Sequence, residues 1–199
     1  MSRTEDQDPV ALVAEIERLR FDMEALRQRA ERAEALADHD VLTPALNRRG
    51  FVNVLNRQMA YCHRHQQSAV LLYMDLDNFK PLNDQYGHAA GDEALRAVVN
   101  ILHQQTRESD AVGRLGGDEF AVVMMNASYE DGKAKARRMQ EQLQSQGFEW
   151  RGQHHALSAS IGVRSLSVQT DPEVWLAEAD TAMWLRKAEK PSSRKNDKI

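Results

Sequence analysis

The sequence contains a single cysteine, Cys62, so it cannot form an intrachain disulfide, and this fits a reducing compartment. It also lacks any apolar run of the roughly 18 residues that a membrane-spanning helix needs. The first residues are acidic, unlike the basic start of a signal peptide. These absences predict a cytoplasmic protein with no membrane partner.

Basic residues are not in excess either, because the formal net charge is −4 at pH 7. No basic stripe with interleaved aromatic side chains is present, which excludes binding to a nucleic-acid polymer by phosphate neutralisation. What the chain does have is 42% hydrophobic residues among 199, enough for one domain with a real core plus an appendage.

The first 38 residues carry a heptad pattern that follows Asp8-Pro9, an N-cap and a proline suited to the first helical position. Apolar residues recur at alternating steps of four and three, at Leu12, Ile16, Leu19, Met23, Leu26, Ala30, Ala33 and Ala37. The pattern predicts a coiled-coil dimerisation and regulatory helix over 1–38, which forms a homodimer or higher homo-oligomer through residues 9–38. The alternative is a single helix that lies on its own domain.

After this helix the pattern changes to alternating helices and strands. The block at 40–44 breaks the first helix, and Thr43 can cap a second one from about Ala45 to His65. The apolar run at 68–74 predicts a strand buried on both faces. The remaining segments predict a helix at 78–86, breaks at Gly87 and Gly91, a helix at 92–105, a hairpin at 110–125, a helix at 130–146, two strands within 148–166 and a last helix from 172 to about 190.

This order of elements predicts an α+β fold of ferredoxin-like type over 39–190, with one central mixed sheet flanked by helices. Residues 191–199 form a polar tail that we expect to be flexible.

The hairpin at 110–125 carries Gly116, Gly117, Asp118 and Glu119 between two apolar runs, which places two adjacent acids at its tip. Glycines there would allow positive φ and the close approach of a large anion, while the two acids repel each other unless a cation lies between them. A divalent metal that carries a nucleotide phosphate meets both conditions. The alternative for the tetrad alone is an acidic, solvated turn.

Five blocks of sequence together resemble the signature motifs of GGDEF domains, the diguanylate cyclases. In chain order they are D-V-L-T-P-A-L-N-R-R-G-F (40–51), M-D-L-D-N-F-K-P-L-N-D-Q-Y-G-H-A-A-G-D-E-A-L (74–95), R-L-G-G-D-E-F (114–120), S-A-S-I-G-V (158–163) and A-D-T-A-M-W (179–184). The resemblance covers about 38–190 and implies a palm-type catalytic domain that holds one GTP. Two such domains would face each other to form the second messenger cyclic di-GMP and two pyrophosphates.

The resemblance also implies roles for individual residues. Asp75 and Asp118 would ligate Mg²⁺, or Mn²⁺ in its place, together with the backbone carbonyl of Leu76. Glu119 would be the other catalytic acid at the tip, assisting the metal or the 3′-hydroxyl of the attacking ribose. The residues implied in GTP binding are Asn83 and Asp92 at the guanine edge, Asn78, Phe79, Lys80 and Lys187 at the phosphates, and Gly116 and Gly117 at the tip.

Arg107-x-x-Asp110 resembles the family's inhibitory site, where the product cyclic di-GMP binds. Arg137 or Arg138 is a candidate to complete this site from a neighbouring domain. The alternative for Arg107 and Asp110 is an exposed i, i+3 ion pair. His88 is predicted to be a packed structural histidine.

Alternative interpretations exist for single residues: Asp75 would be a turn former, and Asn83 or Asp92 a helix cap. The chain departs from the family pattern at Pro44, where glycine is usual, at Trp184, where tyrosine is usual, and at Pro191, where arginine is usual. The last difference predicts weaker GTP affinity rather than loss of activity.

The leading hypothesis is an active diguanylate cyclase driven by dimerisation through the stalk. The alternatives are an inactive GGDEF-type sensor of GTP or cyclic di-GMP, and a coiled-coil scaffold. Asp75, Asp118 and Glu119 favour the enzyme, because inactive versions can tolerate the loss of these acids. We expect the regulatory input to be self-association or a partner protein that binds residues 1–38.

Overall fold

The computed structural model describes residues 9–189, and it describes side chains at 13–27 and 37–188. The chain divides into two compact units, with the boundary between Ala37 and Asp38. Pro191 and the predicted tail lie outside the described residues. Within the described part, no helix is both long enough and apolar enough to cross a membrane.

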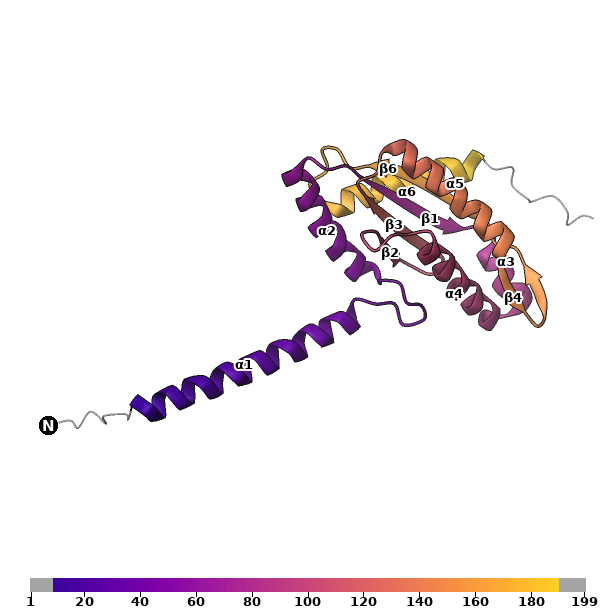
Figure 1. The fold of residues 1–199 in the computed structure, drawn as a ribbon. Coiled ribbons are helices and arrows are strands. Elements are labelled where there is room, and N and C mark those ends of the chain that lie inside the picture. Colours follow the sequence, from indigo (N-terminus) through magenta and orange to yellow (C-terminus); the bar gives the residue numbers. More distant parts are fainter. Residues whose placement is uncertain (1–8, 190–199) are drawn as a thin grey trace, which may run out of the picture. The chain divides into compact units, whose positions relative to one another are not determined.

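The first unit contains the helix α1 (Pro9–Ala37), drawn in indigo and violet in Figure 1. The described residues of the predicted heptad seam are apolar and yet exposed: Ile16 by 42%, Leu19 by 51%, Met23 by 70% and Leu26 by 63%. Phe21, outside the seam, is 75% exposed. The long helix is therefore present, and its pairing into a coiled coil stays a prediction.

The second unit is built on a four-stranded sheet in the order β2-β3-β1-β6. Its strands are β1 (Ala69–Leu76), β2 (Ala111–Arg114), β3 (Glu119–Met125) and β6 (Ala159–Ser165). Every neighbouring pair in this sheet is antiparallel, so the predicted mixed sheet was wrong. The reason is that the chain crosses over from β1 to β2, which does not lie beside β1 in the sheet. Strand β3 then pairs between these two strands and is antiparallel to both.

Alternate residues of β1 point into two cores, one on each face of the sheet. On one face Leu72 and Met74 pack with α4 (His88–Gln104) and α5 (Tyr129–Gln146). On the other face Leu71 and Tyr73 pack with α2 (Arg48–His65) and α6 (Pro172–Glu189). The short helix α3 (Phe79–Tyr86) follows β1 and contacts α4 (Figure 1). The helices therefore cover both faces of the sheet, and the arrangement confirms the predicted ferredoxin-like α+β fold.

The start of the second helix differs from the prediction. Helix α2 begins at Arg48, and Asn47 is its N-cap, whose side-chain oxygen accepts a hydrogen bond from the Gly50 backbone N–H at 3.0 Å. The Thr43 hydroxyl instead donates to Asp40 Oδ1 at 2.7 Å. Threonine and asparagine can both cap a helix. Asn47 is the cap here because the tertiary structure places it, and not Thr43, directly before the first turn of α2.

Three other local predictions need correction. Helix α4 already begins at His88, so Gly91 lies inside it and only Gly87, with φ +85°, marks the break. His88 is exposed rather than packed. The segment 148–166 holds three strands, because β4 (Phe148–Trp150) and β5 (Gln153–His155) form a small hairpin of their own before β6. The two turn residues of this small hairpin, Arg151 and Gly152, have positive φ, as tight hairpins require.

Candidate active site

Acids from two distant segments meet at one end of the sheet. Asp75 lies near the end of β1, and the antiparallel register places it opposite Glu119, the first residue of β3. The backbone N–H of Leu76 donates to the carbonyl oxygen of Asp118 at 3.2 Å, which joins the strand to the hairpin tip. The pairing of β1 with β3 therefore gathers Asp75, Asp118 and Glu119 in one place.

The charge on Asp118 is poorly compensated. Burial raises the pKa of its carboxyl group, the nearby charge of Asp75 raises it further, and the weaker influence of Lys187 does not offset the two. Lys187, from α6, contacts Asp75 directly, and this contact raises the pKa of the lysine although burial alone would lower it. The site thus contains more negative than positive charge and favours a further cation.

The donor atoms at this end of the sheet suit Mg²⁺. The carboxylates of Asp75 and Asp118 are oxygen donors, the ligand type that this ion prefers. Among the described residues, no group of three or more His, Cys, Asp or Glu side chains is arranged to hold a metal ion on its own. Mg²⁺ usually binds through one or two carboxylates and takes its other ligands from water and substrate phosphates, so two acids fit it.

Of the two roles predicted for the tip glycines, positive φ was wrong. Neither has positive φ; within the described residues, the glycines that do are Gly87, Gly147 and Gly152. A Cβ atom on Gly116 would lie 2.6 Å from Glu119 Oε2, so a side chain there would displace the end of the Glu119 side chain, which folds back over the tip. A Cβ on Gly117 would meet no atom within 4 Å, which leaves the main chain open to an incoming group.

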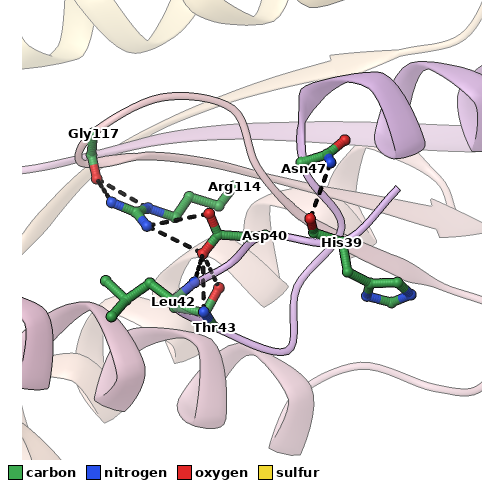
Figure 2. Close-up of polar contacts among 7 residues, drawn as sticks. All are labelled: His39, Asp40, Leu42, Thr43, Asn47, Arg114 and Gly117. Atoms are coloured by element: carbon green, nitrogen blue, oxygen red, sulfur yellow. Dashed lines mark hydrogen bonds and ion pairs between the residues drawn. The ribbon is translucent and has the colours of Figure 1, made fainter. Parts of the chain in front are cut away.

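Arg114 and Asp40 fasten the tip to the segment that precedes α2, as Figure 2 shows. The Arg114 guanidinium donates to the Gly117 carbonyl from Nε at 3.1 Å and from Nη2 at 2.8 Å. Its Nη1 donates to both carboxylate oxygens of Asp40, at 3.1 and 3.3 Å, and the contact is partly buried. Burial alone would raise the pKa of Asp40, but the hydrogen bonds from Thr43 and Arg114 lower it. The sequence pattern did not single out this pair, whose members are 74 positions apart.

Tyr73 is a second residue that the sequence pattern did not single out. It lies two positions before Asp75, on the face of β1 that packs against α2 and α6. Its hydroxyl faces the Glu119 carboxylate; burial raises the pKa of Tyr73, and the charges of Glu119 and Asp180 raise it further. The phenol therefore stays protonated and can donate a hydrogen bond to Glu119.

Five of the residues expected to bind GTP lie on or directly beside α3 and α4. Asn78 precedes α3 with φ 60°, and Phe79 and Lys80 form its first turn, where the N–H groups have no helical partner. Asn83, on α3, has a side-chain oxygen that is buried without a hydrogen-bond partner among the described residues. Asp92, on α4, is half-buried. The contact between the two helices brings Asn83 close to Gly91, the neighbour of Asp92.

Arg107 and Asp110 do not form the alternative ion pair. Asp110 instead accepts hydrogen bonds from the backbone N–H groups of Arg107, at 3.0 Å, and of Met125, at 3.3 Å. Both residues line a pocket of about 240 Å³, together with Asp131, Lys135 and Arg138. Arg138 therefore reaches this pocket from the same chain, where the sequence suggested a neighbouring domain.

A ferredoxin-like antiparallel sheet, with acids at the end of a central strand and at a Gly-Gly hairpin tip, defines a domain of the GGDEF type. The sequence model of the family described as "Diguanylate cyclase, GGDEF domain" matches residues 37–193, and the chain belongs to this family. The probable diguanylate cyclase DgcC of Escherichia coli K12 is 36% identical over 163 residues, which cover 81% of this chain. This chain spans 44% of the length of DgcC and 32% of the E. coli diguanylate cyclase DosC.

Solved structures show the same fold. A sensory box/GGDEF family protein of Caulobacter crescentus CB15 superposes with a TM-score of 0.71 at 32% identity, covering 77% of this chain and 99% of that one. The Pseudomonas aeruginosa diguanylate cyclase SiaD, solved in complex with its activator SiaC, superposes with a TM-score of 0.72 at 25% identity, covering 90% of this chain and 73% of SiaD.

Proposed function

We propose that this chain is a diguanylate cyclase that condenses two GTP molecules into cyclic di-GMP and two pyrophosphates. The observation that carries the proposal is the meeting of Asp75, Asp118 and Glu119 at one end of the sheet, in a chain of the GGDEF family. Phosphoryl transfer is mainly a problem of positioning and charge neutralisation, and a cluster of under-compensated acids supplies the cation site that this requires.

Asp75 and Asp118, with the carbonyl of Leu76, would hold Mg²⁺ or Mn²⁺. The ion would neutralise charge on the triphosphate and orient it for in-line attack. The raised pKa of Asp118 supports this role, because a bound cation would relieve the repulsion from Asp75. Glu119, held by the Tyr73 hydroxyl, would assist the metal or accept the proton of the attacking 3′-hydroxyl.

Lys187 would move from Asp75 to the phosphates when the metal binds, since the two cations compete for one carboxylate. The free N–H groups at the start of α3, beside Asn78, Phe79 and Lys80, would bind the same phosphates. Asn83 and Asp92 would contact the guanine. A carboxylate accepts hydrogen bonds from guanine N1–H and the exocyclic amine, whereas adenine N1 is an acceptor, so Asp92 would reject adenine.

The pocket beside Arg107 would bind cyclic di-GMP as a feedback inhibitor. Arg107, Lys135 and Arg138 give it positive charge suited to the product's phosphates. Asp110 has a structural role in addition, because its carboxylate is already bonded to two backbone N–H groups.

Residues 1–38 would form the stalk, 39–190 the catalytic domain and 191–199 a polar tail. The exposed apolar seam of α1, at Ile16, Leu19 and Met23, supports a parallel pairing with a second copy. Such pairing would raise the rate at which two half-sites meet. A regulatory protein on the stalk is the second way to control that encounter, and SiaD has an activator protein of its own.

The test is to incubate the purified chain with GTP and Mg²⁺ and to separate the nucleotides by chromatography. Cyclic di-GMP should form, and its rate should fall in the variant Leu19→Asp, which places a charge in the seam. Ala14→Asp, an exposed position outside the seam, is the matched control and should keep the rate. Failure to form cyclic di-GMP in any condition, with GTP still bound, would favour the sensor alternative.

A further inference from the structure

Gly91 occupies a helix position at which glycine does not favour helix stability. It lies inside α4, is buried, and directly precedes Asp92. Glycine weakens a helix interior relative to alanine, because it costs more backbone entropy and exposes the main chain. A buried glycine at such a position therefore needs a reason in packing or function.

The reason lies on the neighbouring helix α3. A Cβ atom on Gly91 would lie 1.9 Å from Asn83 Oδ1 and 2.9 Å from Asn83 Cγ. The Phe79 ring is also close, at 3.1 Å. A carbon and an oxygen cannot approach to 1.9 Å without bonding, so any side chain at position 91 must displace the Asn83 amide.

The Asn83 amide oxygen occupies the space that a side chain at position 91 would take. Its oxygen is buried and has no partner among the described residues. Buried acceptors are almost always paired in folded proteins, so an unpaired one beside a candidate binding site is suited to receive a donor from a ligand. A site built to satisfy such a group rejects a ligand that lacks the donor, because the acceptor then stays unpaired.

We infer that Gly91 is a positioning residue for nucleobase selection: its missing side chain keeps the Asn83 oxygen where it accepts a hydrogen bond from the exocyclic amine of guanine. The inference rests on the proposed function, which assigns the guanine edge to Asn83 and Asp92. It adds a testable cause of specificity, since hypoxanthine differs from guanine only in the absence of that amine.

Binding should be measured by equilibrium dialysis with the full chain and the α,β-methylene analogues of GTP and ITP, which cannot release pyrophosphate. The wild-type chain should prefer the GTP analogue roughly tenfold, which corresponds to about 1.4 kcal/mol. Gly91→Ala should remove this preference, mainly by weakening the GTP analogue. Gly132→Ala, in helix α5, is the matched control: its Cβ would meet Val70 Cγ1 at 2.5 Å, and the preference should remain.

A double-mutant cycle separates positioning from general damage. Asn83→Ala should also lose the preference, and adding Gly91→Ala should change nothing further, because the clashing group is gone. Circular dichroism checks folding; if Gly91→Ala does not fold, the double variant should, and a double variant that also fails would overturn the inference. A folded Gly91→Ala chain that keeps the full preference would overturn it as well.

These outcomes are distinct from failure of the proposed function. A wild-type chain that prefers the GTP analogue but forms no cyclic dinucleotide from GTP would refute the cyclase proposal and support this inference. A chain that forms cyclic di-GMP and binds both analogues equally would refute this inference alone.

Discussion

The two ends of the β2–β3 hairpin each carry an aspartate, and the two have opposite surroundings. At the open end, Asp110 accepts hydrogen bonds from two backbone N–H groups, those of Arg107 and Met125. At the tip, burial and the charge of Asp75 raise the pKa of Asp118. One carboxylate is satisfied by the fold and stabilises it, whereas the other is kept at a cost in stability. The difference separates an acid that the fold satisfies from one to which the proposed function assigns a cation.

The fold itself causes the loss of stability at the tip, because it holds the acids close together. The register of β1 with β3 places Asp75 opposite Glu119, and Arg114 fixes the Gly117 carbonyl, so the acids cannot separate without breaking sheet pairing. Local arrangements that oppose stability are expected where function requires them.

The largest effect should come from Asp118→Asn. The rate of cyclic di-GMP formation should fall at least about a hundredfold, because the proposed metal site would lose one of its charged ligands. The melting temperature should not fall and should rise slightly: a carboxyl pKa raised in the folded state means that its ionised form opposes folding at pH 7. Product chromatography and thermal unfolding measure the two. Asp84→Asn, an exposed acid on α3, should change neither.

Asp110→Asn should lower the stability of the fold, in contrast to Asp118→Asn. An amide can keep only one of the two backbone hydrogen bonds and places a donor against the other N–H, so the free energy of unfolding should drop by about 2 kcal/mol. Urea denaturation measures this, with Glu108→Gln as the exposed control in the same turn. A gain in stability, as expected for Asp118→Asn, would contradict the stated difference between the two aspartates of the hairpin.

Asp40→Asn tests the attachment of the tip and should cost about 1 kcal/mol at pH 7, since the ion pair with Arg114 is only partly buried. The folded pKa of Asp40 lies below its ordinary value of 3.8. Its stabilisation should therefore be complete above pH 3.8 and disappear as the pH falls through the lower folded pKa. Urea denaturation of both proteins between pH 7 and 3 measures the difference, and a difference that grows on acidification would contradict the assignment.

The smallest effect should come from adding a positive charge at position 191. Pro191→Arg supplies the cation that the family pattern places there, and it should lower the Michaelis constant for GTP a few-fold by charge-assisted bonding to phosphate. Steady-state kinetics measure it, with Pro191→Gln as the uncharged control. An unchanged Michaelis constant would show that Lys187 and the start of α3 already suffice.

Local patterns predicted much of this architecture. The apolar run before Asp75 gave a strand buried on both faces, and alternating runs around the Gly-Gly tetrad gave a hairpin with its tip in the right place. Each of these signals lies within a few consecutive residues. The conformation of the tip glycines was not predictable in the same way, because the space around Gly116 is set by how the Glu119 side chain folds back.

Long-range contacts were beyond the sequence pattern. The place at which the crossover from β1 returns to the sheet depends on packing against α4 and α5, and so the antiparallel pairing of all four strands was missed. The link between Arg114 and Asp40 joins residues 74 positions apart. Gly91 reads locally as a helix break, and only its contact with Asn83 reveals why glycine occurs inside a helix.

The most direct test of the proposed active site is whether Asp75 and Asp118 share one ion. Mn²⁺ binding can be followed by electron paramagnetic resonance in the presence of the α,β-methylene analogue of GTP, for the wild-type chain, Asp75→Asn, Asp118→Asn and the double variant. If they share it, either single change should weaken Mn²⁺ binding strongly, and the double variant should bind little worse than either single variant. Binding that is unchanged in both single variants, or losses that simply add, would contradict the proposed active site.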